Sequence, residues 1–329
     1  MTKVSLANYW HPISPIGEIT GQPRAYTLLG RNIVAFRDAQ GVCVFDDVCI
    51  HRGTALSLGN VEDGALVCAY HGWRFDRTGK CVLIPSLPDN AAIPKKARLA
   101  AYRAEEANGL VWVALDEPAQ PVPSWTDDAW NNPAYRVFLA GDYHWRSSAG
   151  RAIENAMDLS HLNFVHKGLT ELDDGPRMKP HKVAEPAYGL EYAYEDGRLR
   201  REYQLHTPFT LHDKKMIIRA GRGGTWSEGA APSEGDATIL SFIASPIDAA
   251  RTRLYVFVAR NHDLDADDAK FGEGLERIME QDRVIVESQR PEALPTDLRD
   301  ELHLKVPDAV ALAYRRLLGR IAECAPFMP

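Results

Sequence analysis

Two short segments of the chain each set a cysteine beside a histidine. They read C-x-H at Cys49 and His51 and C-x-x-H at Cys68 and His71. A [2Fe–2S] cluster with two thiolates on one iron and two imidazoles on the other needs two such mixed loops, and its imidazoles raise the reduction potential. The spacing therefore predicts an iron–sulfur cluster bound by these four side chains.

Zinc is an alternative occupant, because two cysteines and two histidines also hold Zn²⁺ tetrahedrally. Zinc fingers, however, pair Cys with Cys and His with His, whereas each segment here is mixed. The remaining alternative is four unrelated buried residues. Cys43, Cys81 and Cys324 have no partner pattern and are interpreted as ordinary thiols, since five cysteines are too few and odd in number for a disulfide scaffold.

A second set of metal-binding residue types begins in an apolar segment over about residues 152–162. Read as a helix, this segment is apolar nearly all round, which predicts that it is buried. Asn155, Asp158 and His161 then share one flank, where burial is costly unless the groups are paired or bind a metal. For these three residues taken alone, the alternative is a buried network of side chains that hydrogen-bond to one another and bind no metal.

A long helix predicted over about residues 266–288 supplies a carboxylate. Asp282 lies in the middle of an apolar stripe at helical spacing, where a carboxylate is unfavourable unless it meets a cation. Two imidazoles and one carboxylate with open positions are the ligand set of non-heme Fe(II) oxygenases. Glu287 is the nearest rival but lies off the stripe, and the aspartates of 263–268 suit a helix start.

The elements that must position these residues divide the chain in two. Apolar runs separated by turn signals make the first third β-rich, with strands expected over Ala25–Phe36, Val42–Phe45, Ala65–Tyr70 and Leu110–Leu115. A proline-rich stretch at 116–123 then predicts a boundary, with a first domain over 1–120 and a second over 121–329.

The second part mixes strands and helices, so the fold class is α+β. A hairpin is expected across Glu195-Asp196-Gly197, between strands over about 190–194 and 199–205, and the Gly- and Ser-rich stretch 221–236 is expected to be a mobile loop. Further strands are expected over about 238–244 and 254–259, and a last helix over about 308–323.

Composition excludes several functional classes. The chain has 329 residues, a net charge of −7 and a pI near 5.9, without a basic cluster, which argues against a nucleic-acid partner. No run of roughly 18 apolar residues predicts a membrane span, and the start lacks signal-peptide features, so a cytoplasmic protein is expected. No G-x-G-x-x-G follows a strand, so nicotinamide or flavin must be carried by a separate protein.

These motifs together resemble those of the Rieske non-heme iron oxygenases, in particular the vanillate demethylase, dicamba monooxygenase and phthalate dioxygenase branch. The pattern N-x-x-D-x-x-H-x₄-H from Asn155 to His166 is similar to the catalytic motif of that family, and residues 280–291 are similar to its C-terminal stretch. The resemblance implies iron ligation by His161, His166 and Asp282, with Asn155 in the pocket beside the iron.

The resemblance also implies the fold and the assembly. A Rieske [2Fe–2S] domain would precede a helix-grip catalytic domain, in which an antiparallel sheet curves around the long C-terminal helix. Asp158, one turn before His161, would link that histidine to His71 of a neighbouring subunit, which implies a homotrimer.

The activity implied is that of a terminal oxygenase. It would use O₂ and electrons from a flavin/iron–sulfur reductase or ferredoxin to hydroxylate or O-/N-demethylate a small aromatic substrate. Residues of about 200–262 are expected to form the walls of the substrate pocket. One alternative is a Rieske electron carrier without oxygenase activity, which the second metal-binding set of two histidines and one aspartate disfavours. Respiratory Rieske proteins also carry two further cysteines, and Thr54 and Tyr70 stand at those places here. A zinc-binding adaptor is the other alternative.

Overall fold

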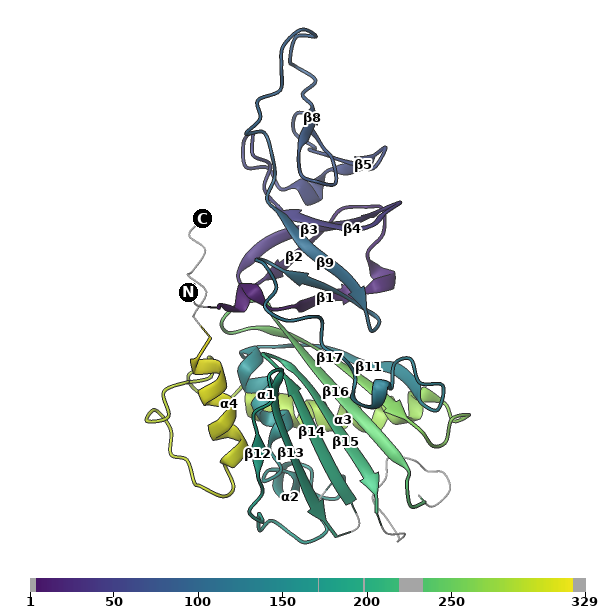
Figure 1. The fold of residues 1–329 in the computed structure, drawn as a ribbon, viewed down its shortest axis with the longest axis vertical. Helices are drawn as coiled ribbons and strands as arrows, with labels where there is room; N and C mark the ends of the chain where they lie inside the picture. The colour runs from purple at the N-terminus through teal and green to yellow at the C-terminus, as the bar shows by residue number, and fades with distance from the viewer. Residues whose placement is uncertain (1–3, 171, 198, 219–232, 322–329) are drawn as a thin grey trace. The chain divides into compact units, whose positions relative to one another are not determined.

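The computed structural model describes residues 4–170, 172–197, 199–218 and 233–321. The chain divides into two compact units between Val122 and Pro123, and each is described by itself (Figure 1).

The first unit consists of two antiparallel sheets. One has six strands in the order β1-β10-β9-β4-β3-β2, and the other has four in the order β5-β6-β7-β8. Their bounds are β1 His11–Pro15, β2 Arg24–Leu28, β3 Arg31–Asp38, β4 Gly41–Asp46, β5 Asn60–Glu62, β6 Ala65–Val67, β7 Arg74–Phe75, β8 Cys81–Leu83, β9 Ala101–Ala107 and β10 Leu110–Ala114. Short 3₁₀ helices are η1 Leu6–Asn8, η2 Ile16–Glu18 and η3 Leu56–Leu58.

The apolar run 25–36 forms two strands, so the prediction of one continuous strand is wrong. Gly30 takes a φ of +78° and reverses the chain, and β2 then pairs with β3. Strand β3 is apolar at successive positions because it is buried on both sides. Ile33 belongs to one core cluster of the unit and Val34 to another, which also contains Cys49 and Cys68.

The second unit is built on a seven-stranded antiparallel sheet in the order β11-β17-β16-β15-β14-β13-β12. The bounds are β11 Arg136–Trp145, β12 Val183–Ala184, β13 Gly189–Asp196, β14 Leu199–His206, β15 Thr210–Ile217, β16 Ala237–Pro246 and β17 Thr252–Arg260. The predicted hairpin is confirmed as β13–β14. The predicted loop 221–236 falls mostly outside the described residues.

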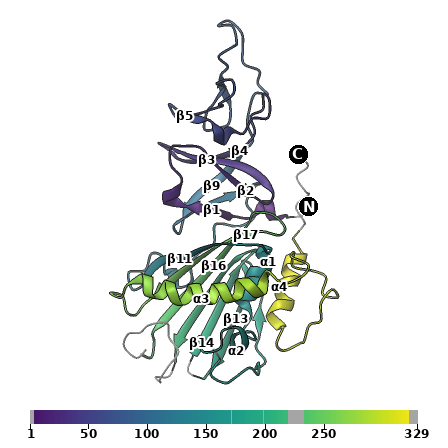
Figure 2. The same ribbon diagram turned by 180° about the vertical axis from the view of Figure 1, so that it is seen from behind.

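The helices of this unit are α1 Ala149–Met157, α2 Leu162–Val165, α3 Asp268–Val286 and α4 Ala309–Gly319, with a 3₁₀ turn, η4, at Thr126–Asp128. Helix α3 runs across one face of the sheet (Figure 2). Its predicted buried stripe is largely confirmed, since Leu275, Met279 and Asp282 are buried, although Ile285 is 46% exposed. The last helix was predicted over about 308–323, but it ends earlier, at Gly319.

This architecture confirms the predicted fold class, a β-rich first unit followed by an antiparallel sheet crossed by a long helix. Within the described ranges, no helix has both the length and the apolar character needed to cross a bilayer.

Candidate metal centres

The two cysteine–histidine loops have the same backbone hydrogen bonds. In the first, the amide of Cys49 donates to the carbonyl of Thr54 at 2.8 Å, and the Gly53 amide donates to the Cys49 carbonyl at 2.8 Å. The second loop repeats this pattern, and its Gly72 amide donates to the Cys68 carbonyl at 3.0 Å. Both glycines have positive φ, +74° and +68°, so the turns favour glycine for a conformational reason.

The loops bury both thiols, whereas His51 is half-buried and His71 is exposed. Cys49 and Cys68 are each 2% exposed, whereas His71 is exposed and its ring centroid lies 4.5 Å from that of His51. Trp73 stacks on His51 at 4.5 Å, and within the described chain the buried Nδ1 of His51 has no hydrogen-bond partner.

A cluster fits these donors. Burial raises the pKa of Cys49 to about 11, so a thiolate there requires nearby positive charge, which iron ligation supplies. The four side chains could therefore hold a [2Fe–2S] cluster with its cysteines in the core and its histidines toward the surface.

Asp158 ends helix α1, so the prediction of an unbroken helix through residue 162 is wrong. Its backbone is extended, with φ −77° and ψ 135°. Its carboxylate accepts hydrogen bonds from the amides of Ser160 at 2.9 Å and His161 at 3.1 Å, which competes with continued helical bonding. Asn155, Asp158 and His161 consequently do not share one helical flank.

The structure brings His161, His166 and Asp282 together. The two Nε2 atoms are 3.2 Å apart, and Asp282 Oδ1 lies 3.5 Å from the His161 Nε2 and 3.1 Å from the His166 Nε2. One ligand atom from each residue lies within 4.8 Å of the other two. The histidines flank α2 and the aspartate comes from α3, so two distant segments meet at this point.

Hydrogen bonds fix the tautomer of both rings. His161 Nδ1 donates to Asp158 Oδ2 at 3.1 Å, and His166 Nδ1 donates to Gln281 Oε1 at 2.9 Å. Because both Nδ1 atoms carry the proton, both Nε2 lone pairs point with Asp282 Oδ1 into one space. Three converging acceptors repel one another unless a cation lies among them, and this donor set fits Fe(II).

The electrostatics of His166 agree with a cation site. Burial lowers the pKa of His166, but the Asp282 carboxylate, whose Oδ1 lies 3.1 Å from the His166 Nε2, outweighs that effect and leaves the pKa raised. Asp282 Oδ1 is itself buried and, among the described residues, has no hydrogen-bond partner.

The rival carboxylates have other partners. Glu287 forms salt bridges with Arg146 and Arg283, each at 3.0 Å. Asp267 caps α3 by accepting from the Ala269 amide at 3.0 Å. Sequence reasoning missed Gln281, whose only signal is a polar residue adjacent to the carboxylate on the same helix.

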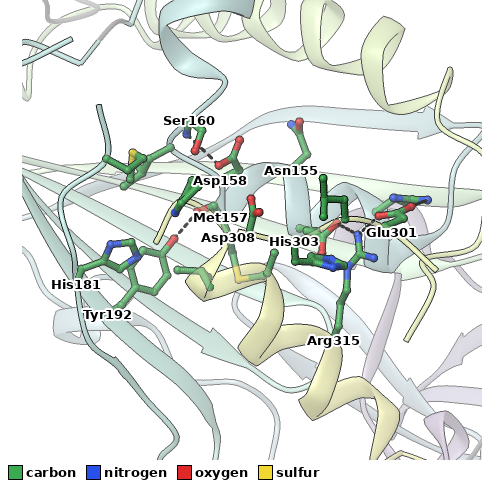
Figure 3. A pocket seen from close by; sticks show the side chains of 18 of the residues that line it. Asn155, Met157, Asp158, Ser160, His181, Tyr192, Glu301, His303, Asp308 and Arg315 are labelled. Atoms are coloured by element: carbon green, nitrogen blue, oxygen red, sulfur yellow. Dashed lines mark hydrogen bonds and ion pairs between the residues drawn. The ribbon is translucent and has the colours of Figure 1, made fainter. Parts of the chain in front are cut away.

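Two cavities meet at Asp158. The inner one lies between α3 and the sheet and is lined by His161, His166 and Asp282 as well as by Asp158. The outer one, about 230 Å³, is lined by Asp158 and by Asn155 (Figure 3). Asn155 is not among the residues lining the inner cavity, so its expected place beside the iron stays a prediction.

Both parts of the chain match known families. Residues 9–102 match the Rieske [2Fe-2S] domain, and residues 145–323 match the vanillate O-demethylase oxygenase C-terminal domain. The curated relatives include two from Pseudomonas putida. Methylxanthine N1-demethylase NdmA is 28% identical over 97% of this chain and 90% of its own, and methylxanthine N3-demethylase NdmB is 30% identical over 89% and 84%.

Solved structures agree with the fold. NdmA of Pseudomonas putida with caffeine superposes with a TM-score of 0.83 at 26% identity, covering 95% of this chain and 90% of that one. Dicamba monooxygenase bound to dicamba gives a TM-score of 0.75 at 20% identity over 96% and 98%, a likeness of fold alone.

These matches confirm the resemblance drawn from the motifs, and they do not support an electron carrier without oxygenase activity. Members of this family carry a Rieske [2Fe–2S] cluster and a mononuclear iron, and they take electrons from a separate reductase or ferredoxin. The chain belongs to the Rieske non-heme iron oxygenases.

Proposed function

We propose that this chain is a terminal oxygenase that removes a methyl group from nitrogen or oxygen on a small aromatic substrate. The observation that carries the proposal is the convergence of two imidazole lone pairs and one carboxylate oxygen on a cavity beside α3. Two relatives that match over most of this chain are N-demethylases, and the C-terminal family is named for an O-demethylase.

In this proposal His161, His166 and Asp282 bind Fe(II), and Cys49, His51, Cys68 and His71 bind the cluster. Bound Fe(II) with open positions supplies the activation of O₂. The overall reaction converts R–CH₃, O₂, two electrons and two protons into R–CH₂OH and water. When the carbon is attached to nitrogen or oxygen, the product divides into R–H and formaldehyde.

The protein groups around this site have defined tasks. Asp158 and Gln281 each keep a proton on Nδ1 of a ligand histidine, so that the opposite nitrogen faces the metal. Leu240, Phe242 and Ile278 line the cavity, of about 40 Å³, with apolar surface, which disfavours water beside the metal site.

We further propose that electrons enter through Asp158 from His71 of a neighbouring copy, within a head-to-tail homotrimer. Two observations support this. His71 is exposed, and the Asp158 side chain is 38% exposed at the outer cavity. Among the described residues that line that cavity, His181 Nε2 and His303 Nδ1 are buried without hydrogen-bond partners, as expected of a surface completed by another chain (Figure 3).

A cytoplasmic location is part of the proposal. Within the described ranges Cys43 and Cys81 are buried free thiols, as is usual in a reducing compartment.

The test compares wild type with Asp282→Ala and with Glu280→Ala, a control on the exposed side of the same helix. Iron and sulfide analysis, EPR of the reduced cluster and formaldehyde release would be measured with a reductase. We expect Asp282→Ala to keep the cluster signal, lose about one iron per chain and release no formaldehyde, while Glu280→Ala resembles wild type. Normal turnover by Asp282→Ala would show that the third ligand is misassigned.

A further inference from the structure

Helix α1 ends where one hydrogen bond is exchanged for another. In a continuing helix, the amide of His161 would donate to the carbonyl of Met157, four residues earlier. That amide donates instead to Asp158 Oδ2, at 3.1 Å. Because Met157 is only 2% exposed, its carbonyl needs a donor from elsewhere in the protein.

Tyr192 supplies that donor from the sheet. Its hydroxyl, on β13, donates to the Met157 carbonyl at 2.6 Å (Figure 3). The ring is buried and stacks on that of Tyr203, the residue directly opposite on β14, with ring centroids 4.3 Å apart and planes at 4°. Burial raises the pKa of Tyr192 well above its ordinary value, so the hydroxyl stays protonated and remains a donor at neutral pH.

The hydrogen bond from Tyr192 holds the peptide group that leads into Asp158. The Met157 carbonyl and the Asp158 amide belong to one planar peptide unit. Tyr192 holds the carbonyl end, and the amide end donates to the carbonyls of Glu154 and Asn155, each at 3.1 Å. With both ends held, the plane has little freedom to rotate, so the sheet sets the direction in which Asp158 leaves the helix.

The Asp158 carboxylate is the group on which that direction acts. It accepts hydrogen bonds from the amide of Ser160 at 2.9 Å and from Nδ1 of the candidate iron ligand His161 at 3.1 Å. Tyr192 lines the outer cavity and Tyr203 lines the inner one, whereas Asp158 lines both. The stacked tyrosines therefore connect the sheet to a carboxylate that the two cavities share.

We propose that Tyr192 is a positioning residue for electron transfer, because its hydroxyl holds Asp158 in the geometry that bridges to His161. The inference rests on the proposed function, in which Asp158 passes electrons from a neighbouring copy to the iron. Tyr192 is not among the residues that line the inner cavity. It acts through the Met157 carbonyl, so its effect should disappear once the Asp158 carboxylate is removed.

The test measures how fast the reduced cluster of the holoprotein is reoxidised after stopped-flow mixing with hydrogen peroxide. This reagent oxidises the mononuclear Fe(II) directly, so no bound substrate is needed. Asp282→Ala, which is expected to lack that iron, gives the background rate at which peroxide oxidises the cluster itself. Tyr192→Phe keeps the ring stack and loses only the hydroxyl. We expect it to retain both metals and to slow the iron-dependent phase about 10-fold, the lower end of the effect of removing a hydrogen bond behind a metal ligand.

Tyr194→Phe is the matched control. Tyr194 lies two residues further along β13 and is also buried, but its hydroxyl accepts a hydrogen bond from the amide of Lys179 at 3.1 Å. The rings of both tyrosines lie 5.7 Å from that of His181. Tyr194→Phe should lose comparable stability in denaturant titrations and keep the wild-type rate. Equal slowing in the two variants would mean that the loss of any buried hydroxyl has this effect, and it would overturn the proposal.

A double-mutant cycle decides whether Tyr192 acts through Asp158. Tyr192→Phe combined with Asp158→Ala should react at the rate of Asp158→Ala alone, within about two-fold, whereas independent effects would multiply. Should Tyr192→Phe fail to fold, as judged by circular dichroism, Tyr203→Leu serves in the same cycle, because it keeps the hydroxyl and removes the ring on which Tyr192 stacks. Effects that multiply, or a wild-type rate in Tyr192→Phe, would overturn the inference.

Failure of the proposed function would be seen in different variants. A wild-type rate in Asp158→Ala, or a wild-type protein that reacts no faster than Asp282→Ala, would show that electrons do not pass through Asp158 to the iron. The role of Tyr192 would then be overturned together with that path. Slowing in Asp158→Ala without slowing in Tyr192→Phe would overturn the role of Tyr192 alone.

Discussion

The replacement of Gln281 by leucine tests how the protein orients its proposed iron ligands. Gln281 Oε1 accepts the His166 Nδ1 proton at 2.9 Å, and His166 is 1% exposed, so no water can replace the lost acceptor without rearrangement. An unpaired buried donor costs about 1–3 kcal/mol. Loss of a hydrogen bond behind a metal ligand typically lowers metal affinity about 10- to 100-fold.

We therefore expect Gln281→Leu to weaken Fe(II) binding by about 10- to 100-fold, equivalent to about 1.4–2.7 kcal/mol. The assay is an anaerobic Fe(II) titration of protein that retains its cluster but has lost the mononuclear iron. Gln281→Glu keeps an acceptor at the same position and should bind iron at least as well as wild type. Unchanged iron affinity in Gln281→Leu would refute the reasoning that this hydrogen bond orients His166.

Three further predictions concern the electron path, the cluster loop and the pH dependence. Because the His161 side chain is 15% exposed, water can replace the acceptor lost in Asp158→Ala, so this variant should retain both metals. It should slow electron transfer between the centres about 10-fold or more, and single-turnover kinetics like those of wild type would exclude a bridging role. Gly72→Ala places a Cβ at a φ of +68° and within 3.2 Å of Pro85. The variant should therefore lower the unfolding free energy of the first unit by about 1–2 kcal/mol and bind less cluster. Gly17→Ala, which meets no atom within 4 Å, is its control in denaturant titrations. Burial lowers the pKa of His212 to about 3, so the folded state keeps this ring neutral while the unfolded chain takes up a proton below about pH 6.5. Stability should therefore be complete above pH 6.5 and fall below it, by up to about 1.4 kcal/mol per pH unit from this residue, and the slope should be smaller in His212→Asn.

Local spacing was enough to predict the cluster loops. Each loop supplies one thiolate and one imidazole within a few residues, and a glycine in each takes the positive φ that the turn requires. The buried face of α3 could also be predicted from the sequence, because helical periodicity places Asp282 within an apolar stripe. Helical periodicity also predicted a helix through Asp158, but there the side-chain carboxylate accepts hydrogen bonds from two following amides and ends the helix.

Other features depend on contacts between segments that are distant in the sequence. His166 meets Gln281 across more than a hundred residues, and nothing in the local pattern of either residue specifies that hydrogen bond. Arg201 and Lys215, which both line the inner cavity, lie opposite each other only because of the register of β14 and β15. A shift of one residue in that register would turn one of the two side chains to the other face of the sheet.

The sequence by itself thus determined which residue types could bind the two metals, since ligand chemistry is carried by side chains at short, readable intervals. Only the tertiary structure decided which atoms converge, which tautomer His161 and His166 each adopt and which charged groups face the cavity beside α3. Those properties depend on strand register and helix packing, which are set by the whole core rather than by any one segment.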